Sequence, residues 1–173
     1  MNQRIEVICL DCGDTLVDEA SEVKDASGAS LRANLIPGAA ELMGRLKEMG
    51  YRLALVADGP AATFHNNLGP YGLFDLFDVY AISGEIGVEK PDQRIFQHAL
   101  EELNVPQEAY GSVLMLGNHL GRDIKGANEL GLISVWLDWS PRRHKVPRDG
   151  SEVPDHTIHL PLELIPLLER LEK

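Results

Sequence analysis

An apolar run at 5–10 ends at Asp11, and the polar loop Cys12-Gly13-Asp14-Thr15 follows it directly. Such a run predicts a buried strand, which would deliver Asp11 to the end of a sheet. A carboxylate held at a strand end is able to act as a nucleophile once nearby cations offset its charge. Asp11 is therefore the candidate nucleophile, and its chemistry depends on which later groups reach the same strand end.

The rest of the chain predicts the elements that would position those groups. Further apolar runs predict strands at 51–57, 79–82, 112–117 and 133–137. Amphipathic stretches predict helices from Pro37 to Gly50, from Pro60 to Gly69, from Asp92 to Leu103, at 123–130 and at 162–171. Parallel strands need such crossovers and bury both faces, so the pattern predicts an α/β fold. We expect a doubly wound, three-layer α/β/α sandwich around a mostly parallel, Rossmann-like sheet.

In doubly wound sheets ligands bind beyond the carboxyl ends of the strands. Four polar residues directly follow predicted strands, namely Asp11, Asp58, Asn118 and Asp138. The chain of 173 residues suits one domain, 1–173. Residues 18–35 are polar and lack apolar periodicity, which predicts a loop or short flap and no sizeable cap.

The net charge and the composition limit the kinds of partner and the cell compartment that the sequence predicts. The net charge of −11 argues against a nucleic-acid partner, because that role needs a basic surface. No apolar stretch is long enough for a membrane span, and the start Met1–Arg4 lacks the pattern of a signal peptide. The two cysteines, Cys9 and Cys12, are expected to be an apolar strand residue and a loop residue, not a metal or redox pair. These features predict a cytoplasmic protein.

Four pieces of sequence occur in an informative order: Asp11-Cys12-Gly13-Asp14-Thr15-Leu16, Val56-Ala57-Asp58-Gly59, Lys90-Pro91 and Gly117-Asn118-His119-Leu120-Gly121-Arg122-Asp123. Each is weak alone, but together, at successive strand ends, they resemble the haloacid dehalogenase-like (HAD) hydrolase superfamily. The resemblance extends over nearly the whole chain and implies a minimally capped HAD fold.

The resemblance implies a magnesium-dependent phosphatase that acts through an aspartyl-phosphate on a small phosphorylated or other anionic substrate. Asp11 would be the nucleophile and Lys90 its charge partner, because a carboxylate and a phosphate repel without nearby cations. Mg²⁺ prefers oxygen ligands, so it would bind Asp11, the carbonyl of Gly13, Asn118 and Asp123.

Phosphate oxygens would bind at the turn Ala57-Asp58-Gly59, where backbone N–H groups precede a predicted helix. The basic loop 140–148 carries four of the sixteen Lys and Arg residues and follows the strand at 133–137. We therefore predict that Arg142 and Arg143 help to bind an anionic substrate, while a solvated polar loop is the alternative interpretation.

Three positions depart from the family pattern. Gly13 stands where the phosphatases usually have a second, acid–base Asp, and whether the adjacent Asp14 replaces it is left open. Ala57 replaces a phosphate-binding hydroxyl, and Asn118 replaces a metal-binding Asp, so the affinity for Mg²⁺ should fall.

Two other functions therefore stay open beside a phosphatase of altered acid–base chemistry. One is a catalytically weak or inactive member that binds a phosphorylated ligand or a protein partner. The other is a metal-free hydrolase of the dehalogenase type, although those enzymes usually enclose the substrate under a helical cap. Because an uncapped site is open, a homo-oligomer in which a neighbouring subunit covers it is a further hypothesis.

Overall fold

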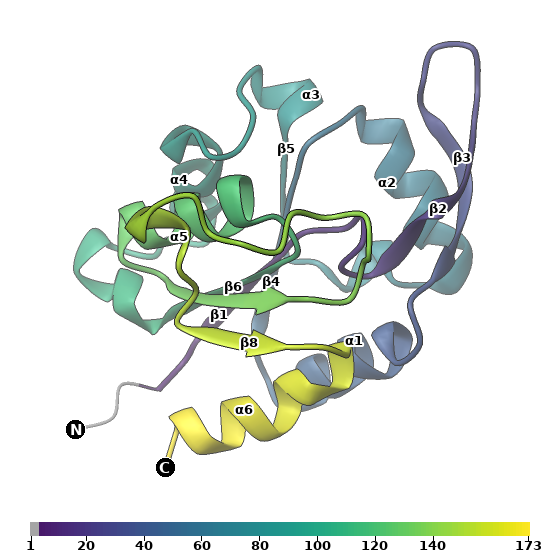
Figure 1. Cartoon of the computed structure of the whole chain (residues 1–173). Coiled ribbons are helices and arrows are strands. Elements are labelled where there is room, and N and C mark those ends of the chain that lie inside the picture. The colour runs from purple at the N-terminus through teal and green to yellow at the C-terminus, as the bar shows by residue number, and fades with distance from the viewer. Residues whose placement is uncertain (1–3) are drawn as a thin grey trace.

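The computed structural model describes residues 4–173, with a six-stranded sheet at the centre (Figure 1). Its strands are β1 (Val7–Leu10), β4 (Arg52–Ala57), β5 (Val79–Ile82), β6 (Val113–Gly117), β7 (Ile133–Leu137) and β8 (His156–Ile158). Their spatial order is β5-β4-β1-β6-β7-β8, and all neighbours pair in parallel. The predicted doubly wound α/β fold is confirmed. Residues 1–3, on which the expectation about the signal peptide partly rests, lie outside the described residues.

Helices cover both faces of this sheet (Figure 1). They are α1 (Ala39–Glu48), α2 (Ala61–Leu68), α4 (Gln93–Glu102), α5 (Lys125–Leu130) and α6 (Leu164–Leu171). Successive side chains of a strand point to opposite faces. Ile8 and Leu10 thus join the core with α1, α2 and α6, whereas Val7 and Cys9 join the core with α4 and α5. β1 is buried on both faces, as its continuous apolar run predicts.

β1 is also the point at which the strand order reverses. β4 and β5 continue the sheet on one side of β1, and β6, β7 and β8 continue it on the other. The connections that leave the neighbouring strands β1 and β6 run through α1 and α5 on opposite faces of the sheet, which leaves a crevice at the carboxyl ends of these strands. Asp11 follows β1 and therefore stands at this crevice.

Residues 18–35, expected as a loop or flap, fold as a β-hairpin of β2 (Val17–Lys24) and β3 (Ser30–Leu35), which rises beside α2 (Figure 1). Hydrogen bonds attach it to α2: Ser30 N–H donates to Thr63 Oγ1 at 3.0 Å, and Ser30 Oγ donates to Asn67 Oδ1 at 2.7 Å. The hairpin is stabilised by backbone pairing and by these polar contacts. Neither requires a periodic pattern of apolar residues, so the sequence pattern did not predict it.

The other predicted strands and helices begin and end within a few residues of their expected positions, and β8 is a strand of the sheet that was not predicted. Two more differences concern the helices. The helix expected from Asp123 is preceded by a π turn at Leu120–Ile124, in which the N–H groups of Asp123 and Ile124 both donate to His119 O. A short helix, α3 (Ser83–Ile86), follows β5. Short 3₁₀ turns lie at Gly69–Tyr71, Phe74–Leu76, Gln107–Ser112, Gly150–Glu152 and Pro161–Glu163. None of the helices within 4–173 has the length and apolar content that a membrane span requires.

Candidate active site

Asp11 immediately follows the last residue of β1. Its N–H donates to Leu116 O at 3.0 Å, so pairing with β6 determines where the chain leaves the sheet. The loop then closes on Cys12, whose carbonyl oxygen accepts hydrogen bonds from the N–H groups of residues 15–17. This tight turn leaves the Asp11 side chain in the wall of a cavity of about 250 Å³.

Lys90 is the cation closest to Asp11. It follows α3 in the chain, and its Nζ donates to Asp11 Oδ1 at 2.8 Å, Asp123 Oδ1 at 2.7 Å and Val56 O at 2.8 Å. An ammonium group has three N–H donors, so these acceptors satisfy it completely. The backbone N–H of Lys90 donates to Asp58 Oδ1 at 3.0 Å, which holds the loop in place. The structure thus brings the predicted nucleophile and its predicted charge partner into direct contact.

Burial by itself lowers the pKa of Lys90, but the carboxylates of Asp11, Asp123 and Asp58 outweigh it, so this pKa lies above its ordinary value. Burial and the charge of Asp123 raise the pKa of Asp11, whereas Lys90 lowers it. Lys90 is consequently a permanent cation beside the carboxylate. A fixed positive charge in a site shielded from water is what attack on an anionic group requires.

The side-chain amide of Asn118, just after β6, reaches the other oxygen of Asp11. Asn118 Nδ2 lies 2.7 Å from Asp11 Oδ2, 2.6 Å from Gly13 O and 3.1 Å from Thr15 Oγ1, so its two N–H groups face three acceptors. Asn118 Oδ1 accepts from Arg143 Nε at 2.8 Å. Which end of an amide is nitrogen follows from its partners, and here three oxygens surround one end while a guanidinium faces the other. The Asn118 amide therefore presents N–H groups to Asp11.

Asp123 is a further buried charged side chain at this site, beside Asp11 and Lys90. Its Oδ1 bonds to Lys90, and its Oδ2 accepts from the N–H groups of Asn118 and His119, both at 2.9 Å. A Cβ at Gly117 would collide with the Asp123 carboxyl group, so only glycine at that position permits this approach. Both Asp123 oxygens are occupied by the chain itself, and the residue aligns Lys90 and the turn after β6.

The four predicted magnesium ligands come together, but their donor atoms do not fit Mg²⁺ in this arrangement. Mg²⁺ binds oxygen atoms, whereas Asn118 presents an N–H group to the site. The Asn118 amide nitrogen donates hydrogen bonds to Asp11 Oδ2 and to the Gly13 carbonyl oxygen, which are two of the predicted magnesium ligands. Asp123 uses both of its oxygens on other donors. The chain's own donors thus occupy the oxygens that a metal would need.

The predicted phosphate-binding turn lies at the end of β4, with two of its three residues at the cavity. Asp58 and Gly59 line the cavity, next to the first turn of α2. Gly59 N–H donates to Ser83 Oγ at 2.9 Å, so this predicted phosphate donor already has a partner within the chain. Burial raises the pKa of Asp58, against the lowering effect of Lys90. Ala57, the third residue of the turn, is fully buried and packs in the hydrophobic core.

The basic loop reaches the site through Arg143. Its Nε bonds to Asn118, its Nη2 donates to Glu19 Oε2 at 2.5 Å, and the side chain lines the cavity. Arg142 lies further out, 44% exposed, and its Nη2 bonds to Asp14 Oδ2 at 2.8 Å. Of the two arginines predicted to contact substrate, the structure brings Arg143 to the cavity.

Asp14, the residue considered as a replacement acid–base group, is fully buried. Its Oδ1 accepts from Glu19 N–H at 3.1 Å, and its Oδ2 lies 2.8 Å from Arg142 Nη2 and 3.2 Å from Arg143 Nη2. Its backbone adopts φ 52°, which turns the loop back toward β2. Asp14 thus ties the hairpin and the basic loop to the turn after β1.

Glu19 on β2 is a cavity residue that sequence reasoning missed. Its carboxyl group lies against Gly13, where an added Cβ would collide with it. The surrounding strand is polar and carries no motif, so no sequence signal distinguishes Glu19 from the neighbouring acidic residues. Only the folding of the hairpin over the turn after β1 reveals it.

His119 also lines the cavity. Its Nδ1 is buried and has no hydrogen-bond partner within the described residues. Burial, together with Arg122 and Arg143, lowers the pKa of His119, which favours the neutral imidazole.

Cys9 and Cys12 are both buried free thiols.

An aspartate at a strand end, bonded to a buried lysine, thus lies where the strand order of a doubly wound sheet reverses. A family model described as haloacid dehalogenase-like hydrolase matches residues 26–131. The chain is 37% identical to a glyceraldehyde 3-phosphate phosphatase of Methanopyrus kandleri over 130 residues, 75% of this chain and 54% of that protein. This chain belongs to the haloacid dehalogenase-like hydrolase family.

Solved structures agree with that family. An HAD phosphatase from Thermococcus onnurineus superposes with a TM-score of 0.67 at 28% identity, over 79% of this chain and 59% of that chain. A dehalogenase superposes with a TM-score of 0.79 at 18% identity, over 96% and 98% of the two chains, which supports the fold alone. The chain spans about half the length of the curated relatives it matches.

Proposed function

We propose that this protein is a phosphatase-like hydrolase in which Asp11 attacks the phosphorus of a phosphorylated substrate. The observation that carries the proposal is the contact of Asp11 Oδ1 with Lys90 Nζ at 2.8 Å in the wall of a polar cavity. A nucleophilic carboxylate must approach a phosphate dianion, and a fixed cation at this distance offsets the repulsion. Phosphatases among the relatives support the same reaction class.

The reaction would proceed in two displacements. An Asp11 oxygen forms a bond to phosphorus while the bond to the leaving oxygen breaks, which gives an aspartyl-phosphate. Water then attacks phosphorus, the Asp11–phosphate bond breaks, and phosphate leaves. Lys90 and Arg143 supply positive charge at the cavity. Phosphate binding at the turn Asp58–Gly59 would require the Gly59 N–H to leave Ser83 Oγ.

Magnesium remains a prediction from the family resemblance. For Asn118 to bind it, the amide would have to turn its oxygen toward Asp11 and give up the hydrogen bond from Arg143 Nε. The amide brings no negative charge, so the affinity would be lower than with a carboxylate at this position. The protein's own cations, Lys90 and Arg143, provide charge compensation in the arrangement seen here.

The proposed substrate is a small phosphorylated or otherwise anionic molecule. Relatives are named for glyceraldehyde 3-phosphate and phosphoserine, and these substrates belong to those proteins. About half of each relative has no counterpart in this chain, so its specificity need not carry over. We also propose a cytoplasmic protein without a nucleic-acid or membrane partner, and self-association that covers the open site.

A panel of alkyl, aryl and acyl phosphates, assayed with and without Mg²⁺, tests the proposal. We expect turnover by the parent and its loss in Asp11→Asn, because the amide removes the nucleophile while keeping the shape of the side chain. Turnover of no phosphate compound under either condition, or full activity in Asp11→Asn, would reject the proposal. A metal-free hydrolase would show the same rate after chelation.

A second function is favoured by the number of bonds already made inside the site. Asp11 accepts hydrogen bonds on both oxygens from Lys90 and Asn118, and Arg143 is bonded to both Asn118 and Glu19. A site so fully connected could hold an anionic ligand without rapid turnover. Binding of a phosphorylated compound by calorimetry, with no hydrolysis, would identify this function instead.

A further inference from the structure

The turn after β1 lacks a side chain at one position that faces the cavity. Gly13 lies two residues after Asp11, and its carbonyl oxygen shares the donor Asn118 Nδ2 with Asp11 Oδ2. A Cβ placed on Gly13 would collide with the carboxyl group of Glu19, with Oε1 as the nearest atom. The Glu19 carboxyl group therefore fills the space that a side chain at position 13 would take.

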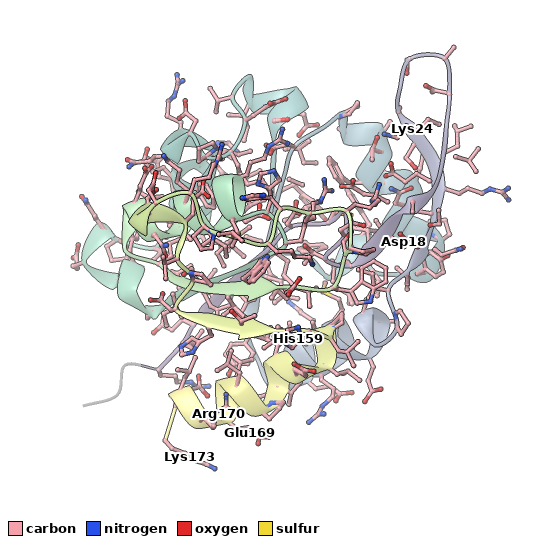
Figure 2. All side chains as sticks on the ribbon, in the orientation of Figure 1. Asp18, Lys24, His159, Glu169, Arg170 and Lys173 are labelled. Atoms are coloured by element: carbon pink, nitrogen blue, oxygen red, sulfur yellow. The ribbon has the colours of Figure 1, made fainter. Side chains whose placement is uncertain are left out.

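Glu19 is held there by the base of the hairpin. Its N–H donates to Asp14 Oδ1 at 3.1 Å, and its Oε2 accepts from Arg143 Nη2 at 2.5 Å. In the part of the chain that the structure describes, no hydrogen bond reaches Oε1. Figure 2 labels Asp18, the preceding residue, near the base of β2, and Lys24 nearer the hairpin tip. One oxygen of Glu19 is thus anchored while the other remains available at the cavity.

The other carboxyl groups at the cavity have partners on both oxygens or hold the loops in place. Glu22 Oε1 accepts from Asn67 Nδ2 at 3.0 Å, and its Oε2 lies 3.3 Å from Lys24 Nζ. Asp14 is fully buried with both oxygens bonded, and Asp123 uses both oxygens on Lys90 and two backbone N–H groups. Asp58 holds the backbone of Lys90 and faces Arg122 at 3.6 Å.

We propose that Glu19 is the general acid–base residue of the site and acts from the hairpin through its free Oε1. This role rests on the proposed function. When the Asp11–phosphorus bond forms, the electron pair of the breaking ester bond goes to the leaving oxygen, which takes the proton from Glu19. The Glu19 carboxylate then accepts a proton from the attacking water as the Asp11–phosphate bond breaks, which restores its protonated form.

The test compares two leaving groups in Glu19→Gln. The leaving carboxylate of acetyl phosphate needs no proton, whereas the alkoxide of glycerol 3-phosphate does. We expect kcat/KM for glycerol 3-phosphate to fall by about 10²–10⁴-fold, while kcat/KM for acetyl phosphate changes less than about tenfold. Asp18→Asn, a charge change at the neighbouring β2 residue, should leave both rates unchanged.

A second variant pair separates catalysis from support of the hairpin. Glu19→Ala empties the space beside Gly13, and the combination with Gly13→Asp puts a carboxyl group back into it from the other side. We expect the double variant to recover at least tenfold of the alkyl-ester rate lost in Glu19→Ala. Equal losses on both substrates in Glu19→Gln, or acetyl phosphate turnover by the parent without any alkyl-ester turnover, would overturn the role of Glu19 alone. A parent that turns over no phosphate compound would overturn the proposed function and this role together.

Discussion

Asn118 Nδ2 lies 2.7 Å from Asp11 Oδ2, and this contact puts an N–H donor where the family pattern has a metal ligand. The same nitrogen also binds the carbonyl oxygen of Gly13, and Arg143 holds the far end of the amide. The oxygens around Asp11 are therefore linked by the chain itself. The replacement of a carboxylate by Asn118 changes how the site is held together, as well as its charge.

Asn118→Asp should make the protein dependent on a divalent metal for stability. The new carboxylate would face Asp11 Oδ2 with no donor between them, which should cost roughly 3–5 kcal/mol of unfolding free energy. Asp11 and the new carboxylate would supply the oxygen ligands and negative charge that Mg²⁺ prefers, so Mg²⁺ should recover part of this loss. Thermal unfolding of parent and variant, with Mg²⁺ and with a chelator, measures the effect. An equal Mg²⁺-induced rise in the unfolding temperature of both proteins would contradict the prediction.

Lys90→Met should destabilise the fold by roughly 3–5 kcal/mol at neutral pH, because it leaves Asp11 and Asp123 buried without a cation. Asp11 already has a raised pKa, and loss of Lys90 should raise it further. A carboxyl group whose pKa is higher in the folded protein loses stability as the pH rises from its unfolded pKa through its folded pKa. The penalty should therefore be smaller at pH 5 than at pH 8 in urea unfolding.

A matched control for that variant is Lys47→Met. Lys47 forms a partly exposed pair with Asp78 at 2.9 Å, and such pairs contribute about 0–1 kcal/mol. Equal losses of stability in Lys47→Met and Lys90→Met would show that burial of the Lys90 charges has no special cost.

Gly117→Ala should lower stability by roughly 1–3 kcal/mol, because the added methyl group would collide with the Asp123 carboxyl group. Displacement of that group would also loosen its bonds to Asn118, His119 and Lys90. Gly44→Ala is the control: nothing lies within 4 Å of its added Cβ on α1, so stability should stay equal or rise by up to about 1 kcal/mol. Urea unfolding of both variants gives the comparison.

The two thiols should not react in the folded protein. Burial raises the pKa of Cys9 to about 12, against the lowering effect of Lys90, and burial raises the pKa of Cys12 well above its ordinary value. At pH 8 about one Cys9 thiol in ten thousand would be ionised, and the thiolate is the reactive form. Titration with a chromogenic disulfide should detect no rapid reaction in buffer and two thiols per chain in denaturant. Rapid reaction in buffer would show that the turn after β1 opens.

Sequence alone predicted five of the six strands of the central sheet and its five longer helices, but not β8 or the hairpin of β2 and β3. The strand predicted at 79–82 is β5, and Asp92 accepts the N–H of Arg94 as the N-cap of α4. These features depend on apolar periodicity and local capping, which a short stretch of residues encodes by itself. The positions of Asp11, Asp58 and Asn118 after strands follow from the same periodicity, since a strand's end predicts which residue leaves the sheet.

Tertiary structure decided which groups meet at that end. Glu19 lies near Gly13 only because the hairpin folds over the turn after β1, and Arg143 reaches Asn118 across 25 positions of the chain. The amide of Asn118 points its nitrogen at Asp11 because a guanidinium and three oxygens surround it, a condition that depends on several segments at once. Strand ends are encoded locally, whereas the protonation and hydrogen bonding of the side chains there depend on neighbours supplied from elsewhere in the fold.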